Sequence, residues 1–136
     1  VALAVTTRSS SKELRYTKEH EWIRAEGEIG TVGITDYAQH ALTDIVFVEL
    51  PEKGKQAEQF KRLAVLESVK SVSDVFSPAS GEVVETNSAL PTAPEKINQS
   101  PYAEGWIAKI KLKDAKELDA LMSAEQYEEY LSKAKH

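Results

Sequence analysis

The sequence of 136 residues contains no cysteine. This absence excludes a disulfide framework, a thiolate metal site and a cysteine nucleophile, and it is compatible with a reducing compartment. No apolar run approaches the roughly 20 residues that a membrane-spanning helix needs, so we expect no membrane as partner. With 41% apolar residues, the chain is long enough to form about one domain around a hydrophobic core.

The chain also has fewer basic than acidic residues. The chain has 17 basic and 22 acidic residues, a net charge of −5. Residues 1–12 contain Arg8 and Lys12 and no acid, so the remainder carries −7. Phosphate binding needs clustered Lys and Arg, and this acidic chain therefore predicts no nucleic acid as partner. The charge instead suits docking onto basic patches of other proteins.

Catalytic and metal-binding motifs are missing as well. We find no phosphate loop and no ordered Ser-His-Asp set. The three histidines, His20, His40 and His136, lack the spacing of metal ligands, which favours a structural role for His20 and predicts no metal. The chain is therefore predicted not to be an enzyme.

What the sequence does offer is a lysine presented between two strand-like runs. Leu63–Leu66 is a short apolar run, and a second one, Val72 to Phe76, ends before Pro78. The serines between them favour a turn, which predicts a β-hairpin with Lys70 at its tip. Most lysines on turns are only solvating charges. Here the strand-like flanks give the turn a rigid base, and acidic residues on both sides could frame recognition by a modifying enzyme.

The rest of the chain reads as mainly β with short helices. We expect Tyr16 to Ile23 to lead into a first strand, and further strands over 29–34, 45–50, 82–86 and 106–112. A helix capped by Thr35 is expected over 36–43, and a loop over 87–105. Residues 56–62 give no clear signal. The C-terminus is predicted to be helical, with capping-box spacing at Asp114/Glu117 and at Ser123/Gln126.

The stretch around Lys70 resembles the lipoylation site of the glycine cleavage H-protein family, whose pattern runs E-S-V-K, a small residue, x-S-D or x-S-E, and S-P. Here it reads Glu67-Ser68-Val69-Lys70-Ser71-Val72-Ser73-Asp74, followed by Ser77-Pro78. The D-K-A tip of 2-oxoacid dehydrogenase lipoyl domains and the M-K-M tip of biotin carriers are absent. The resemblance implies that lipoate is attached covalently to Lys70 and that the lipoate-attaching enzyme recognises Glu67, Ser68, Val69 and Asp74.

The resemblance covers about residues 14–132. Its further matches are Tyr16 with His20-Glu21-Trp22, Gly33 to Gln39, Asn98, Ser100-Pro101-Tyr102 and Gly105-Trp106. It implies a lipoyl-type barrel-sandwich hybrid of two antiparallel sheets, with the lysine-bearing hairpin and C-terminal helices. We expect residues 13–136 to form this single carrier domain.

The resemblance also implies a function. The chain would be the lipoyl-carrying shuttle of the glycine cleavage system, with no turnover of its own, because the chemistry belongs to the cofactor and to partner active sites. It would take the aminomethyl group from glycine decarboxylase (P-protein) to aminomethyltransferase (T-protein), and the dithiol to dihydrolipoamide dehydrogenase (L-protein). Glu21 and Asp74 are our candidates for a cleft that holds the cationic amine of the loaded arm. The alternative is that both are plain surface acids.

The sequence departs from the family pattern at three places. Thr43 stands where the family usually has glycine, which is expected to change the C-terminus of the preceding helix. The glycine turn that relatives often carry within 56–62 is missing, and Glu19 replaces a small polar residue before His20. None of these positions is the proposed attachment residue.

Two questions of context stay open at this stage. The Ser-rich, acid-free residues 1–12 read as a disordered segment, either the end of an organellar transit peptide or a tag remnant. They favour the mitochondrial matrix as location over a bacterial cytoplasm. Two functional alternatives to the lipoyl carrier are a biotinyl-type carrier and a non-enzymatic interaction module in which Lys70 is unmodified.

Overall fold

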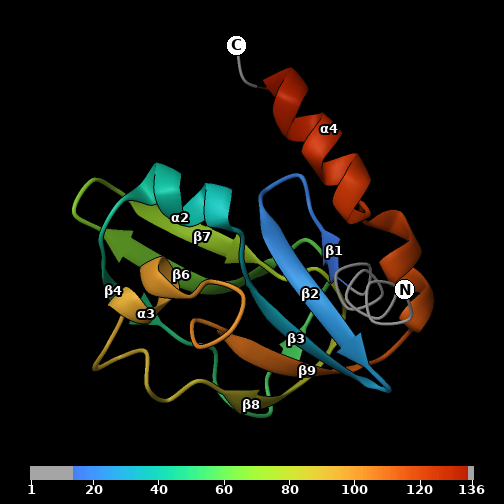
Figure 1. Cartoon of the computed structure of the whole chain (residues 1–136). Helices are drawn as coiled ribbons and strands as arrows, with labels where there is room; N and C mark the ends of the chain where they lie inside the picture. Colours follow the sequence, from blue (N-terminus) through green and yellow to red (C-terminus); the bar gives the residue numbers. More distant parts are fainter. Residues whose placement is uncertain (1–13, 135–136) are drawn as a thin grey trace, which may run out of the picture.

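The computed structural model describes residues 14–134, and it consists of two antiparallel sheets with a few short helices (Figure 1). The six-stranded sheet has the order β1 (Leu14–Tyr16), β2 (Glu21–Glu26), β3 (Ile29–Ile34), β9 (Ala108–Leu112), β8 (Gly81–Thr86) and β5 (Gln56–Ala57). The three-stranded sheet has the order β4 (Ile45–Glu49), β6 (Arg62–Ser68) and β7 (Val72–Phe76). The predicted mainly β fold of two antiparallel sheets is confirmed. The predictions for residues 1–12 lie outside the described residues.

The hairpin of β2 and β3 forms one half of the apolar core. Glu21 pairs with Ile34 and Glu26 with Ile29, and Gly27 makes the turn with a φ of 64°. A positive φ is cheap only for glycine, which explains why the chain reverses there. The side chains of Trp22 and Ile23, at the start of β2, are buried.

The hairpin of β6 and β7 projects Lys70 from the second sheet. Its register pairs Glu67 with Val72 and Val65 with Asp74. The side chain of Leu66 lies between these rows and is fully buried against the first sheet. Alternating inward and outward residues hold the hairpin in a single register, because a slip of one residue would expose Leu66.

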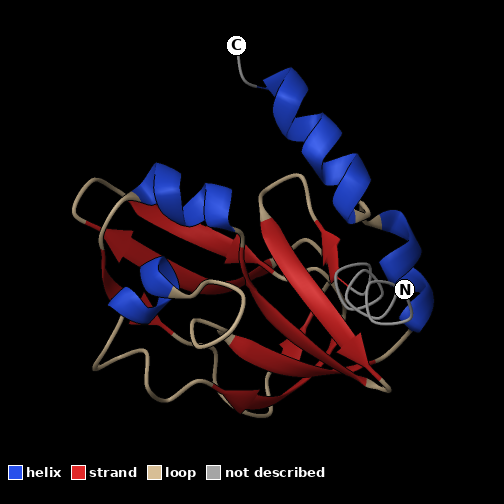
Figure 2. Ribbon diagram, in the orientation of Figure 1, coloured by secondary structure: helices blue, strands red, loops and turns tan. Residues whose placement is uncertain are grey.

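The helices lie at the periphery of a body made of strands, and the last one extends away from it (Figure 2). They are α2 (Asp36–Leu42), α3 (Glu95–Gln99), the 3₁₀-helix η1 (Ala115–Ala120) and α4 (Ala124–Ala134). The side chain of Thr35 accepts from the amide of Ala38 at 3.2 Å, which confirms the predicted cap of α2. No helix within residues 14–134 is long and apolar enough to span a membrane.

Three sequence expectations need correction. The segment 87–105 contains α3 rather than loop alone. Gln56–Ala57, for which the sequence gave no clear signal, forms the short strand β5. Trp106 precedes β9 instead of beginning it. Ala115–Ala120 is a 3₁₀-helix, and its cap residue Asp114 accepts from the amide of Lys116 at 3.0 Å. Glu117 does not complete the capping box with Asp114, because its carboxylate accepts from the amide and hydroxyl of Ser80 at 2.7 and 2.8 Å. These features depend on partners far along the chain.

The second predicted capping box is confirmed. The amide of Gln126 donates to the Ser123 hydroxyl at 3.2 Å, and the amide of Ser123 donates to the Gln126 side chain at 2.9 Å. Both bonds satisfy amide groups that otherwise lack partners at the start of α4. One turn further, Tyr127 packs on Tyr16 with ring centroids 4.6 Å apart, which joins α4 to β1.

Candidate functional site

Lys70 lies on a turn that Ser68 organises. The Ser68 amide donates to the carbonyl of Ser71 at 2.8 Å. The Ser68 hydroxyl oxygen accepts from the amides of Lys70 and Ser71, both at 3.0 Å. The amide of Val69 donates to the carbonyl of Asp44 at 3.0 Å, so the tip is braced against the segment before β4. The backbone of the turn is therefore fixed, while the Lys70 side chain is exposed.

Apolar side chains surround this turn on the solvent side. Phe47, Glu67 and Val72 lie side by side across the three strands, because Glu67 pairs with both of the others. Phe47 is 49% exposed, Val72 is 65% exposed and Val69 is 67% exposed. We call Phe47, Val69 and Val72 the apolar collar. Exposed apolar side chains gathered beside one lysine are typical of a surface that a protein partner covers.

Asp74 lies on β7, four residues past Lys70. Its carboxylate is half-exposed and pairs with the guanidinium of Arg62 at 3.8 Å. Pairs this exposed contribute little to stability, so Asp74 remains available to other partners.

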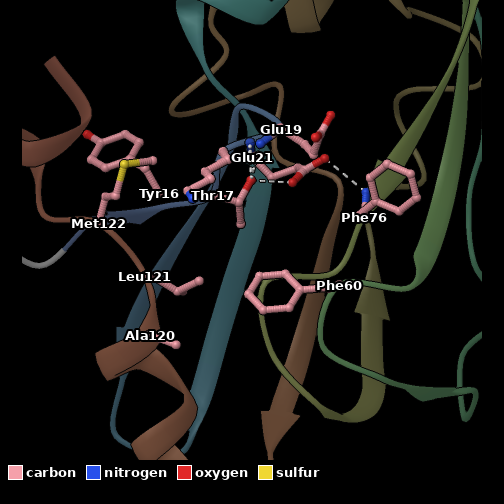
Figure 3. Close-up of a pocket in the computed structure, with 10 residues that line it drawn as sticks. Tyr16, Thr17, Glu19, Glu21, Phe60, Phe76, Ala120, Leu121 and Met122 are labelled. Atoms are coloured by element: carbon pink, nitrogen blue, oxygen red, sulfur yellow. Dashed lines mark hydrogen bonds between the residues drawn. The ribbon is translucent and has the colours of Figure 1, made fainter. Parts of the chain in front are cut away.

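Glu21 differs from Asp74 in its environment, because its side chain is only 1% exposed. One carboxylate oxygen accepts from the Thr17 hydroxyl, and the other accepts from the amide of Phe76 at 3.0 Å (Figure 3). The bond to Phe76 joins β2 of the first sheet to the end of β7. The alternative that Glu21 is a plain surface acid is therefore wrong.

Burial also changes the acidity of Glu21. Desolvation raises its pKa to about 7, against the two hydrogen bonds from Thr17 and Phe76, which lower it. No basic side chain within residues 14–134 lies within ion-pair distance of its carboxylate. Glu21 is therefore a buried acid that is close to half-ionised at neutral pH and is stabilised only by hydrogen bonds.

Two cavities adjoin Glu21. A small one of about 190 Å³ lies between α2 and the β6–β7 hairpin and is lined by both Glu21 and Asp74. Its other walls are largely apolar and include Ile34, Ala38, Leu42, Leu66 and Val75. A larger cleft of about 710 Å³ has Phe60, Phe76, Leu121 and Met122 among its lining residues (Figure 3). The two acids predicted to share a cleft thus line the same small cavity.

His20 has a structural position beside this cavity. Its φ is 74°, and its Nδ1 lies 2.8 Å from the Tyr127 hydroxyl, which in turn lies 2.8 Å from the Thr35 hydroxyl. Burial lowers the pKa of His20, which favours the neutral ring. These bonds tie α4 and the cap of α2 to the turn before β2.

The sequence did not point to Thr17, to Tyr37, or to the Phe76 amide as parts of the site. Tyr37 lines the small cavity from α2. Thr17 stands four residues before Glu21, a spacing at which a hydroxyl can bond back to a turn, and this was the only sequence signal. The Phe76 amide is 55 residues away from Glu21 and could not have been identified from local pattern.

Comparison with known proteins gives consistent matches. The family model described as glycine cleavage H-protein matches residues 14–134. The glycine cleavage system H protein of Halothermothrix orenii is 58% identical over 120 residues, covering 88% of this chain and 94% of that protein. The same protein of Caulobacter vibrioides is 55% identical over 118 residues, covering 87% and 98%. The crystal structure of a glycine cleavage system H protein from Mycobacterium marinum superposes with a TM-score of 0.79 at 36% identity, covering 92% of this chain and 98% of that one.

Proposed function

The chain belongs to the glycine cleavage H-protein family, the lipoyl carriers of the glycine cleavage system, and we propose that Lys70 is the residue that carries the lipoyl group. Members of this family are carriers and not catalysts, so the chain acts as a shuttle. The biotinyl carrier and the interaction module considered from the sequence are therefore set aside. The single observation that supports Lys70 best is its exposed side chain on a turn whose backbone is fixed by Ser68.

The residues around Lys70 fit a lipoyl group. Lys70 forms no ion pair with the described residues, so acylation of its amine would break no such contact. The small cavity offers apolar walls to a hydrocarbon chain and two acids, Glu21 and Asp74, to a cationic amine. When attached, lipoate supplies a disulfide that takes up and releases groups and electrons. The protein's part is to present the group and to exclude water from it.

We infer that the lipoate-attaching enzyme recognises the turn through Glu67, Ser68, Val69 and Asp74. Ser68 supports this role by fixing the backbone of the tip. Val69 offers an exposed apolar side chain, while Glu67 and Asp74 offer negative charge on either side of the lysine. Together these residues combine a fixed shape with charge, which favours a partner with basic residues around an apolar patch.

The partners follow from the family in the same way. We propose that the chain docks in turn with the P-protein, the T-protein and the L-protein of the glycine cleavage system. The relatives named above are bacterial, so they give no support to the mitochondrial location or the transit peptide that the first twelve residues favoured. They favour the alternative, a bacterial source.

A reconstituted system tests the proposal. Lys70→Arg keeps the charge and removes the acylation site, and we expect it to abolish glycine cleavage by the P-, T- and L-proteins after incubation with the lipoate-attaching enzyme. Lys61→Arg, a substitution at the exposed lysine that precedes β6, is the matched control and is expected to retain activity. Activity that survives Lys70→Arg would contradict the assignment of Lys70.

A further inference from the structure

Thr17 is a buried threonine in the turn between β1 and β2, and the structure uses its hydroxyl fully. The oxygen accepts from the amide of Glu19 at 3.2 Å and from the amide of Glu21 at 3.1 Å. A hydroxyl oxygen has two acceptor positions and one hydrogen to donate. With both acceptor positions occupied by amides, the hydroxyl donates its hydrogen to the carboxylate of Glu21, and Figure 3 marks this bond with a dashed line.

Because the Thr17 hydroxyl donates to Glu21, the hydrogen bonds around this carboxylate favour one of its two charge states. The carboxylate receives one hydrogen from Thr17 and another from the amide of Phe76, at 3.0 Å. A protonated Glu21 would need an acceptor for its own hydrogen, and the Thr17 oxygen has none to offer. Hydrogen bonds donated to a carboxylate stabilise the ionised form more than the neutral form.

We propose that Thr17 is a positioning residue that favours the ionised form of Glu21 and holds its carboxylate between β2 and the Lys70 hairpin, beside the cavity shared with Asp74. Its value to the carrier rests on the proposed function, in which Glu21 faces a cationic amine. The positioning itself does not depend on whether Lys70 is lipoylated.

The other charged and titratable groups near Glu21 do not provide an alternative explanation. Those lining the two adjoining cavities are Tyr16, Lys18, Glu19, His20, Tyr37 and Asp74. Glu19 repels the charge of Glu21 and acts against ionisation. Lys18 is exposed and is not paired with Glu21 within the described chain. The two hydrogen bonds are therefore the main local support for the anion.

The Phe76 amide gives a direct way to test this inference. Its resonance in a ¹⁵N-labelled, unlipoylated protein should follow the ionisation of Glu21, because it donates to that carboxylate. We expect Thr17→Val, which keeps the shape and loses the hydroxyl, to raise the midpoint of this titration by about one to two pH units. Thr17→Ser should keep the midpoint of the unsubstituted protein, and Glu21→Gln should abolish the titration.

A midpoint that is the same in Thr17→Val and in the unsubstituted protein would overturn the proposal, even if Thr17→Val were less stable. Should Thr17→Val fail to fold, Thr17→Ala tests the same loss. A measurement on the unsubstituted protein is independent of both variants: the Thr17 hydroxyl proton should exchange slowly and shift with the same midpoint as the Phe76 amide. A rapidly exchanging hydroxyl proton would count against the proposal. None of these results depends on acylation of Lys70, so they are separate from the test of the carrier function.

Discussion

Thr43 is a non-glycine residue in a backbone conformation that glycine prefers. It ends α2 with φ of 64° and ψ of −150°, a conformation that only glycine adopts without strain. The family pattern usually has glycine here, and in this chain Thr43 takes a conformation that suits glycine. The Thr43 carbonyl accepts from the side chain of Asn98 at 2.8 Å, and this contact holds the strained turn.

We predict that Thr43→Gly stabilises the protein by about 1 kcal/mol, because the relief of strain exceeds the entropy that glycine adds to the unfolded chain. The bond from Asn98 to the backbone would be kept. Urea denaturation measures the change in the free energy of unfolding. Thr43→Ala keeps the strain and serves as control. Equal stability of the glycine and alanine variants would show that the conformation is not strained.

Glu21 makes stability depend on pH. Its pKa is about 7 in the folded protein, above the ordinary value of 4.5, so the folded state binds more protons between these two pH values. The free energy of unfolding therefore falls as pH rises through this window, by about 3 kcal/mol in total, and the contribution is constant above it.

We predict that Glu21→Gln removes this dependence. Relative to the unsubstituted protein, the variant should gain about 3 kcal/mol of stability between pH 4 and pH 8, because the cost of the buried charge is gone. Chemical denaturation at several pH values measures this difference. Glu52→Gln, at an exposed acid, is the control and should leave the pH dependence unchanged. A parallel pH dependence in the Glu21→Gln and unsubstituted proteins would contradict a raised pKa.

At the scale of the elements, the side chain of Tyr127 attaches α4 to the rest of the fold. The Tyr127 hydroxyl lies 2.8 Å from both His20 Nδ1 and the Thr35 hydroxyl. Within residues 14–134, the Tyr130 hydroxyl, three residues later, donates only to the Lys18 carbonyl, at 3.2 Å and near the surface. The attachment of α4 therefore depends on a buried polar contact at its first turns.

We predict that Tyr127→Phe lowers the free energy of unfolding by about 1 to 3 kcal/mol, because it leaves the buried hydroxyl of Thr35 and the half-buried ring of His20 without this partner. Tyr130→Phe, the matched control, should cost less than about 0.5 kcal/mol. Hydrogen exchange of the α4 amides would show whether the helix itself is released. Equal effects of the two substitutions would refute the anchoring role of Tyr127.

The sequence predicted those elements whose signals are local. The β6–β7 hairpin, α2 and the capping box of α4 could be predicted because their strand pattern or cap residues lie within a few positions of one another. The helix α3 has only five residues in a proline-rich segment, and its neighbourhood is held by distant contacts such as Asn98 with Gln39 at 3.0 Å. The strand β5 exists because it pairs with Gly81 and Glu82.

The same limit applies to the site. The position of Lys70 at the tip of the β6–β7 hairpin could be predicted because the residues that form this hairpin are its own neighbours in the sequence. The burial of Glu21 could not, since it depends on the Phe76 amide and on apolar side chains of the second sheet. The loop before β6 is another example. Phe60 adopts a φ of 66° in the segment where relatives often carry a glycine turn. The sequence alone could not show that an aromatic residue adopts this positive φ.

For the molecule as a whole, an acidic surface and the apolar collar together indicate how partners approach. The net charge of −5 favours encounter with basic surfaces, and the collar adds apolar area next to Lys70. We predict that Phe47→Ser slows lipoylation of Lys70 by the lipoate-attaching enzyme about tenfold, as expected for loss of an apolar contact of about 1.4 kcal/mol.

Phe60→Ser is the matched control for this prediction. Phe60 is 52% exposed, close to the 49% of Phe47, but it lines the larger cleft and does not belong to the collar. Initial rates of adduct formation, followed by mass spectrometry, compare the two variants. Equal rates for both would show that the collar does not contribute to docking.

The central claim is that Lys70 carries lipoate, and intact-mass measurement of the protein from its native source, with peptide mapping of the β6–β7 hairpin, tests it most directly. We expect one lipoyl group per chain, located on Lys70. A lipoyl group on another lysine, a biotinyl group on Lys70, or native protein that stays unmodified in a cell with an active lipoate-attaching enzyme would contradict the account.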